Sequence, residues 1–212
     1  MDKKITIVGC GPGSEEYLTA AAVSAVQRAK VILGAQRLLD LFPGSEARRV
    51  ALGTRIEGLS RSLEDAVEDG PVAVLVSGDP GVFSLAKLVV RRFGRDACRV
   101  IPGISSVQAA FAAIGLDWAD ARIISAHKED PDATLWHGSA PGDKIAVLAG
   151  RSAAVEWIAD LVESMPRDRR VFVCEDLSLS GQRISEAAPE DIRSLEVSSR
   201  TVFLIIREGL LT

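Results

Sequence analysis

The sequence has few of the residues that usually carry acid–base or metal chemistry. Only two histidines and three cysteines occur in 212 residues. The cysteines, Cys10, Cys98 and Cys174, lie far apart in apolar runs, without the close spacing of metal ligands. They are typical of buried thiols in a reducing compartment. We therefore expect no metal site, and we expect a cytoplasmic protein.

A strong charge of one sign and long apolar runs are also missing. The formal net charge is −4, without a long run of one sign, which disfavours a nucleic-acid partner. No uninterrupted apolar run approaches the ~20 residues that span a bilayer, so no membrane segment is expected. The N-terminal "MDKKITIVG" has no signal-peptide core. With 47% hydrophobic residues, the chain can still bury a sizeable core.

Strand-like and helix-like segments alternate along the chain, which is typical of an α/β protein with a largely parallel sheet. Strands are predicted at 5–8, 31–33, 72–76 and 99–101. Helices are predicted at 19–30, within 55–70 and at 105–114. Thr19 is the expected N-cap of the first helix, and Gly70 is expected to end the second.

The composition changes after residue 115. Residues 116–143 are rich in Asp, Trp, His and Pro, and a helix is predicted at 153–165. Three further apolar runs are "KIAVLAG", "RVFVCEDL" and "RTVFLIIRE". No long amphipathic helix joins the last two, so a mixed or antiparallel sheet is expected. We predict an N-terminal α/β domain, 1–115, with a mostly parallel sheet, and a C-terminal α/β domain, 116–212, with a mixed sheet.

The first strand runs into a glycine-rich turn, "GCGPG", of the kind that holds phosphates in dinucleotide-binding folds. Its glycines do not have the G-x-G-x-x-G spacing, and Pro12 has no N–H for a phosphate. The next strand ends without a carboxylate for a ribose, and no G-x-x-x-x-G-K-[ST] loop occurs. A phosphate site is therefore not expected. The alternatives are a tight turn alone and a ligand without phosphate.

Three loops that follow strands are rich in Gly and Pro: "GCGPG", "SGDPGVFS" and "IPGISS". In a parallel sheet such loops meet at the carboxyl ends of the strands, where open α/β folds bind ligands. Asp79 is the only acid in them, and its carboxylate can accept hydrogen bonds from a ligand's hydroxyl or amine groups. The alternative for Asp79 is a turn in which the side chain bonds its own backbone.

The longer segments around these loops read "VGCGPGSEEYLTAAAVSAVQRAKVILGAQRLL", "SGDPGVFSL" and "VIPGISSVQAAFAAIGLDWADARIISAH". With G-x-G-P-G, G-D-P-G and P-G-I-S-S in this order, they resemble the tetrapyrrole methylase family of S-adenosylmethionine-dependent enzymes. Within it they look most like the CbiE branch, the precorrin-7 (cobalt-precorrin-7) C5-methyltransferases of cobalamin biosynthesis. The resemblance is close over residues 5–128 and looser beyond. One departure is Lys128-Glu129 after His127, where that branch usually has Gly-Arg.

The resemblance implies two α/β domains, a homodimer, and S-adenosylmethionine bound in the cleft between the domains and released as S-adenosylhomocysteine. This donor has no phosphate, so Pro12 loses nothing by lacking an N–H. The residues that match the family's donor site are Pro12, Ser77, Gly78, Asp79, Val82, Ser105 and Ser106, with Leu148 and Leu177 from the second domain.

A sulfonium methyl group is already activated, so its transfer to a meso carbon of a precorrin requires alignment more than a strong base. Alignment can contribute ~7 kcal/mol. His127 is the candidate for accepting the proton that leaves; the alternative is that it only holds a loop. The implied substrate carries many carboxylates, and the candidates to bind them are Arg37, Arg122, Lys128 and Arg183. The alternative for each of these cations is a solvated surface role.

The resemblance leaves other functions open. Some relatives are fusions whose second half methylates C15 and removes a carboxyl group, and this chain lacks that half. It is then expected to act at C5 only, as a free subunit, as a piece of a fusion, or in association with the C15-methyltransferase/decarboxylase. The same fold could instead act on another ring position, a protein or a ribosomal RNA. From other classes, the alternatives are a dinucleotide oxidoreductase and a non-catalytic binding module.

Overall fold

The computed structural model describes residues 4–53, 57–127, 130–131 and 142–211. Contacts within it divide the chain into two units, Met1–Ser105 and Ser106–Thr212. We call them the N-terminal unit and the C-terminal unit. Among the helices of the described ranges, none is long and apolar enough to cross a membrane.

The N-terminal unit is built on five parallel strands in the order β3-β2-β4-β1-β5. The strands are β1 (Ile5–Gly9), β2 (Val31–Gly34), β3 (Arg48–Ala51), β4 (Val72–Val76) and β5 (Cys98–Ile101). The central strands β2 and β4 are buried along their whole length, because helices cover both faces of the sheet. The predicted parallel sheet is confirmed.

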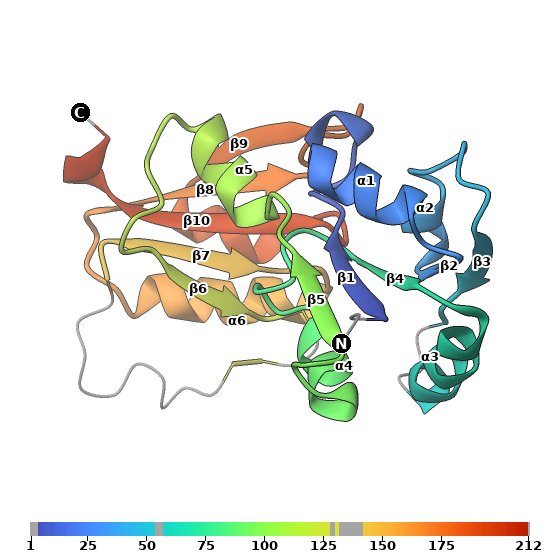
Figure 1. Ribbon diagram of the computed structural model, residues 1–212. Helices are drawn as coiled ribbons and strands as arrows, with labels where there is room; N and C mark the ends of the chain where they lie inside the picture. The colour runs from blue at the N-terminus through green and yellow to red at the C-terminus, as the bar shows by residue number, and fades with distance from the viewer. Residues whose placement is uncertain (1–3, 54–56, 128–129, 132–141, 212) are drawn as a thin grey trace. The chain divides into compact units, whose positions relative to one another are not determined.

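Four helices cover this sheet (Figure 1): α1 (Ala20–Gln27), α2 (Gln36–Leu39), α3 (Glu57–Asp69) and α4 (Ala86–Phe93). A short 3-10 helix, η1 (Glu15–Tyr17), precedes α1. The helices α1 and α2 pack on one face through a cluster that includes Val26 and Leu38. The helices α3 and α4 pack on the other face, in the cluster of Leu63 and Val89. The carboxyl ends of the strands therefore remain as the edge where loops can gather.

Two predicted helix ends are confirmed. The Oγ1 atom of Thr19 accepts a hydrogen bond from Ala22 N–H at 3.1 Å, so Thr19 is the N-cap of α1. Gly70 follows the last residue of α3 with a φ of 132°, a backbone conformation that favours glycine. Both ends are set by local chemistry that can be read from the sequence.

The C-terminal unit is built on a mixed sheet in the order β6-β7-β10-β8-β9, where β6 and β7 are parallel and the other neighbours antiparallel. Its strands are β6 (Arg122–Ser125), β7 (Lys144–Leu148), β8 (Arg169–Glu175), β9 (Arg183–Ala187) and β10 (Thr201–Arg207). Its helices are α5 (Ser106–Ala113), α6 (Ser152–Glu163), η3 (Pro189–Ser194) and η4 (Glu208–Leu210). Separate apolar clusters place α5 on one face and α6 with η3 on the other (Figure 1). The predicted mixed sheet is confirmed.

The division between the units lies before α5, whereas the sequence places the domain boundary after residue 115. Val107, Ala110 and Phe111 of α5 are buried in one cluster with Ala146 and Leu204 of the C-terminal sheet. The helix therefore belongs with the sheet that buries its apolar face. Its position before the change in composition does not reveal this partner.

Candidate functional site

Loops at the carboxyl ends of β1, β4 and β5 meet in the N-terminal unit; they are residues 9–13, 77–84 and 102–105. A Cβ atom on Gly9 would lie 2.6 Å from Gly103 N and 2.8 Å from Gly78 O. A Cβ atom on Gly103 would lie 2.5 Å from Gly78 O. The three backbones thus approach too closely for a side chain at Gly9 or at Gly103, which is why glycine occupies these two positions. We call this contact the glycine junction and the three segments the donor loops.

Hydrogen bonds join the first two donor loops. Gly11 N–H donates to Gly78 O at 3.3 Å, and Gly78 N–H donates to Gly11 O at 2.8 Å. Both residues have positive φ, 72° and 65°, which would strain any larger residue. Pro12 follows and is buried in this turn. The first loop is therefore fixed by its backbone. It requires glycine at Gly9 because of the close contacts and at Gly11 because of the positive φ.

Asp79 ties the second donor loop to the third. Its Oδ1 accepts a hydrogen bond from Gly81 N–H at 2.7 Å, which confirms the turn that the sequence offers as the alternative role. Its Oδ2 accepts from Gly103 N–H at 3.1 Å. Each carboxylate oxygen has a further lone pair. Asp79 can therefore hold the loops and still accept a hydrogen bond from a ligand.

The second donor loop carries the other predicted contacts and one that sequence reasoning missed. Ser77 is exposed and Val82 is half-buried. The missed residue is Phe83, which is 64% exposed and has a φ of 45°. A bulky side chain in that conformation is strained, and exposure to water forgoes the burial that would offset the strain. Phe83 is therefore a candidate for contact with a bound molecule.

Arg37 and Cys10 lie near the first donor loop. Cys10 N–H donates to Val76 O at 2.9 Å, directly after β1. Burial raises the pKa of the Cys10 thiol to about 12, opposed in part by a hydrogen bond between the thiol and the backbone of Val76 and by the positive charge of Arg37. The thiol is thus neutral at pH 7 and inert as a nucleophile. Arg37 supplies a cation close to this loop.

In the C-terminal unit, strand pairing places several predicted residues in one row of strand ends, which includes the carboxyl ends of β6, β7 and β8. We call this row the edge of the C-terminal unit. The pairs that form this row are Ser125 with Leu148, Leu148 with Val202, Thr201 with Glu175, and Glu175 with Arg183. His127 and Leu177 follow the ends of β6 and β8 at the same edge. His127 is exposed, and its Nδ1 lies 3.3 Å from Ala149 O. His127, Leu148, Leu177 and Arg183 therefore lie along the same end of the sheet, at the ends of β6, β7, β8 and β9.

Glu175 joins three segments of this edge. Its carboxylate is buried and accepts hydrogen bonds from Arg183 Nε at 2.7 Å and from Ser198 N–H at 3.0 Å. Arg183 was expected at the substrate, and the structure gives it a first role as the partner of a buried carboxylate. The side chain of Arg183 is 65% exposed, so other N–H groups of its guanidinium can still reach a ligand.

The loop after β8 is fixed in an unusual conformation. Asp176 and Ser178 have positive φ values of 46° and 68°. Asp176 pairs with Arg200 at 2.7 Å, and Ser178 N–H donates to Gln182 Oε1 at 2.7 Å. Leu177, between them, is buried in the cluster beneath α5. Its side chain serves the core, so any contact with a donor would use its backbone.

The remaining predicted residues lie in different positions. Arg122 begins β6, at the opposite end of that strand from His127. Ser105 is the last residue of the third donor loop and is buried, whereas Ser106 begins α5 of the C-terminal unit. Lys128 lies outside the described residues. Within the described ranges, no group of three His, Cys, Asp or Glu side chains could hold a metal ion.

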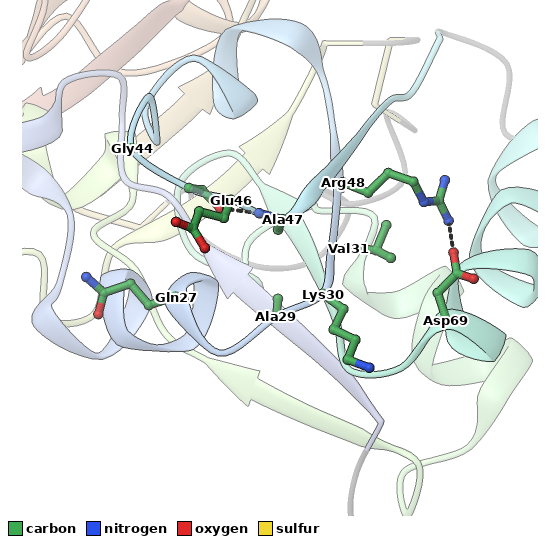
Figure 2. A pocket seen from close by; sticks show the side chains of 10 residues that line it. Gln27, Ala29, Lys30, Val31, Gly44, Glu46, Ala47, Arg48 and Asp69 are labelled. Atoms are coloured by element: carbon green, nitrogen blue, oxygen red, sulfur yellow. Dashed lines mark hydrogen bonds and ion pairs between the residues drawn. The ribbon is translucent and has the colours of Figure 1, made fainter.

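A separate pocket lies at the amino ends of β2 and β3 (Figure 2). Lys30, Arg48 and Asp69 are among its lining residues. Arg48 points at Asp69 and pairs with it at 2.5 Å, so the charges of Arg48 and Asp69 neutralise each other. Ligands of open α/β folds bind at the carboxyl ends of the strands. The donor loops, and not this pocket, are therefore the candidate site.

The fold and the site define a class of protein that comparison with known families identifies. A model of the tetrapyrrole (corrin/porphyrin) methylases matches residues 4–192. The chain belongs to this family of methyltransferases. The predicted family and enzyme class are confirmed.

Three similar proteins narrow the comparison. Cobalt-precorrin-7 C(5)-methyltransferase of Salmonella typhimurium is 32% identical over 85% of this chain and 88% of that protein. The crystal structure of cobalamin biosynthesis precorrin-6Y methylase (cbiE) from Archaeoglobus fulgidus is 29% identical, covers 96% of this chain and 98% of its own, and has a TM-score of 0.72. Uroporphyrin-III C-methyltransferase of Thermus thermophilus, crystallised with S-adenosyl homocysteine, matches with a TM-score of 0.81 at 24% identity over 99% and 100% of the two chains. The two structures confirm the predicted fold class.

Proposed function

We propose that this chain transfers a methyl group from S-adenosylmethionine to C5 of precorrin-7 or cobalt-precorrin-7, a step of cobalamin biosynthesis. The observation that carries the proposal is the glycine junction tied by Asp79, at the carboxyl ends of parallel strands. The name of the similar Salmonella protein supports C5 as the position.

The donor loops suit a cation without phosphate. None of the three contains Lys or Arg, and Asp79 is their only acid. A negative charge attracts the sulfonium and the ammonium of S-adenosylmethionine and repels a diphosphate. Pro12, Ser77, Gly78 and Val82 are assigned to contacts along the donor.

The remaining donor contacts are assigned on the resemblance. Ser105 is the last residue of the third loop, and Ser106 follows it. Leu148 and Leu177 belong to the edge of the C-terminal unit, where Leu177 offers only its backbone because its side chain is buried. S-adenosylmethionine supplies an activated methyl group, and the chain binds it, orients it and excludes water.

The substrate offers an extended ring and many carboxylates. Arg37 lies close to the first donor loop, and Arg183 keeps exposed N–H groups beyond its pair with Glu175. Both can bind carboxylates. The exposed ring of Phe83 offers a flat apolar face for the macrocycle. Arg122, at the start of β6, and Lys128, outside the described residues, are assigned to the substrate on the resemblance alone.

The test is a methylation assay with methyl-¹³C S-adenosylmethionine and either precorrin-7 or cobalt-precorrin-7. The new methyl carbon, located by NMR, is expected on C5. Asp79→Ala is expected to weaken S-adenosylhomocysteine binding by about 10–100-fold, the equivalent of one or two hydrogen bonds to a charged group. A methyl group on another ring carbon would overturn the C5 assignment and leave the family unaffected.

The proposal extends to the assembly and the compartment of the protein. The resemblance suggests a homodimer, which light scattering after size-exclusion chromatography would detect, and a contact with the C15-methyltransferase/decarboxylase, which co-purification would detect. A reducing cytoplasm is supported by the cysteines, since Cys10, Cys98 and Cys174 are all buried free thiols.

A further inference from the structure

His127 lies against the backbone of a neighbouring loop. It follows the end of β6, and its imidazole Nδ1 lies 3.3 Å from the carbonyl oxygen of Ala149, which follows the parallel strand β7. The residue itself is exposed. One nitrogen of the ring is therefore directed at a backbone acceptor, while much of the side chain is open to solvent.

Gly150 provides the space that the ring occupies. A Cβ atom on Gly150 would overlap Nδ1 of His127, and it would lie 2.6 Å from Cε1 of the same ring and 2.7 Å from Ser199 O. Gly150 is not among the residues with positive φ, so its backbone conformation does not require glycine. The requirement is the close approach of the imidazole on one side and the Ser199 carbonyl on the other.

The segments on both sides of this contact are fixed by hydrogen bonds. Ala126 N–H donates to Leu148 O at 2.9 Å, and Arg151 Nε donates to Ala126 O at 2.9 Å. Arg151 also pairs with Asp130. Ala149 N–H donates to Thr201 O at 2.9 Å. The backbone before His127 and the carbonyl that faces its ring are thus held in register by three strands.

A backbone carbonyl only accepts hydrogen bonds, so Nδ1 of a neutral His127 must carry the proton in this contact. The other ring nitrogen, Nε2, then has a free lone pair. We propose that Gly150 is a positioning residue that holds His127 in its Nδ1–H tautomer, so that Nε2 accepts the proton released from the substrate. The role in catalysis rests on the proposed function.

Methyl transfer to C5 is completed by loss of the C5 proton. The methyl–sulfur bond breaks while the methyl–C5 bond forms, and the sulfonium becomes a neutral thioether. Nε2 of His127 takes the proton from C5, and the electron pair of the C5–H bond returns to the macrocycle. The imidazolium that results carries protons on both nitrogens and keeps its hydrogen bond to Ala149 O.

The tautomer can be measured without substrate. The chain has two histidines, His127 and His137, so the His137→Gln protein has one imidazole to observe by ¹⁵N–¹H NMR. The expected spectrum of the neutral ring shows a protonated Nδ1 and an unprotonated Nε2. A protonated Nε2 in this protein overturns the proposal, whatever the fate of the substitutions described next.

Two variants test the positioning role. Gly150→Ala is expected to abolish the pure Nδ1–H pattern and to lower kcat at least 10-fold with KM for S-adenosylmethionine unchanged. Gly209→Ala is the matched control, because a Cβ atom there meets nothing within 4 Å. His127→Asn keeps a donor for Ala149 O and loses the basic nitrogen, so we expect a folded protein whose kcat falls by about 10²–10⁴-fold.

The outcomes separate the inference from the proposed function. Wild-type kcat in His127→Asn, or an unchanged tautomer and kcat in Gly150→Ala, overturns the positioning role. Methylation at a carbon other than C5 overturns the proposed substrate instead. The NMR result decides the tautomer in either case, because it requires neither donor nor precorrin.

Discussion

The two units hold their strand-end loops by different means. In the N-terminal unit the loops touch through backbone atoms, at Gly9, Gly78 and Gly103, and the side chain of Asp79 joins the second loop to the third. In the C-terminal unit the corresponding edge depends on side chains, above all the buried carboxylate of Glu175. A backbone junction tolerates no change of residue, whereas a side-chain network can lose one member and repack.

This difference fits different tasks. A rigid backbone surface presents fixed N–H and C=O groups, which suits a donor that is the same in every turnover. A network of charged side chains can be adjusted to the carboxylates of a particular ring without altering the sheet. We therefore expect substitutions of the junction glycines to damage folding and donor binding together. Substitutions at the C-terminal edge are expected to change substrate binding with a smaller loss of stability.

The largest effect is expected for Gly103→Ala. Its Cβ atom would lie 2.5 Å from Gly78 O and 2.7 Å from Gly9 C, and none of these backbone atoms can move without shifting a strand. We expect a loss of about 3 kcal/mol or more in the free energy of unfolding, measured by urea denaturation. Gly44→Ala, where a Cβ meets nothing within 4 Å, is the control and should be near neutral. Wild-type stability of Gly103→Ala would rule out the close junction.

A smaller loss is expected for Glu175→Gln. The carboxylate is buried, but its partner Arg183 is 65% exposed, so solvent screens the pair. We expect about 1–2 kcal/mol of lost stability, mainly from the weakened hydrogen bonds to Arg183 and Ser198. Glu186→Gln is the matched control on the neighbouring strand, because its pair with Arg170 is exposed and solvent screens it, so its loss should change the stability little. Equal losses in the two variants would contradict a special role for Glu175.

A pH experiment compares one buried thiol from each unit. Burial raises the pKa of Cys10 and of Cys174 to about 12. Both thiols are protonated in the folded and unfolded chain at pH 8, but the unfolded thiols ionise above about pH 9. Stability is therefore lost as pH rises from 9 towards 12, by about 1.4 kcal/mol per thiol at pH 10. Urea denaturation gives the free energy of unfolding at pH 8 and at pH 10, and Cys10→Ala and Cys174→Ala should each reduce the difference between these two values. An equal loss of unfolding free energy from pH 8 to pH 10 in the wild type and both variants would refute the shifted pKa values.

The smallest stability change, and one of opposite sign, is expected for Phe83→Gly. Glycine adopts the φ of 45° without strain, so the variant should gain about 0.5–1 kcal/mol. If the exposed ring contacts the macrocycle, KM for the precorrin should rise about 10-fold while the Kd for S-adenosylhomocysteine stays constant. Phe83→Tyr keeps the ring and should keep the wild-type KM. Unchanged KM in the glycine variant would show that the strain has another cause.

Much of the fold could be predicted because its central strands are apolar throughout. The strands β1, β2 and β4 and the mixed character of the sheet that holds β8 and β10 follow the sequence pattern, and the edge strand β5 was predicted from its short run at 99–101. The edge strands β3, β6 and β9 were missed; each is paired on one side only, and the residues of β3 and β9 are mostly exposed. Without an apolar period, an edge strand cannot be recognised from its own residues.

Part of the site could also be predicted from the sequence, and part could not. The donor loops are recognisable by their glycine and proline residues, so Gly78 and Asp79 could be named from the sequence. The contacts of His127 with Ala149 and Gly150 and of Glu175 with Ser198 join residues far apart in the chain. No local pattern encodes such pairs, because they arise only when the strands are aligned. The strained φ of Phe83 likewise has no signal in "GVFS".

The most direct test of the central claim is a crystal structure of the protein with S-adenosylhomocysteine. We predict that the homocysteine part lies on the donor loops, with the ligand in contact with Pro12, Asp79 or Val82. A ligand bound at the amino ends of the strands, beside Arg48 and Asp69, or away from both edges, would contradict the account.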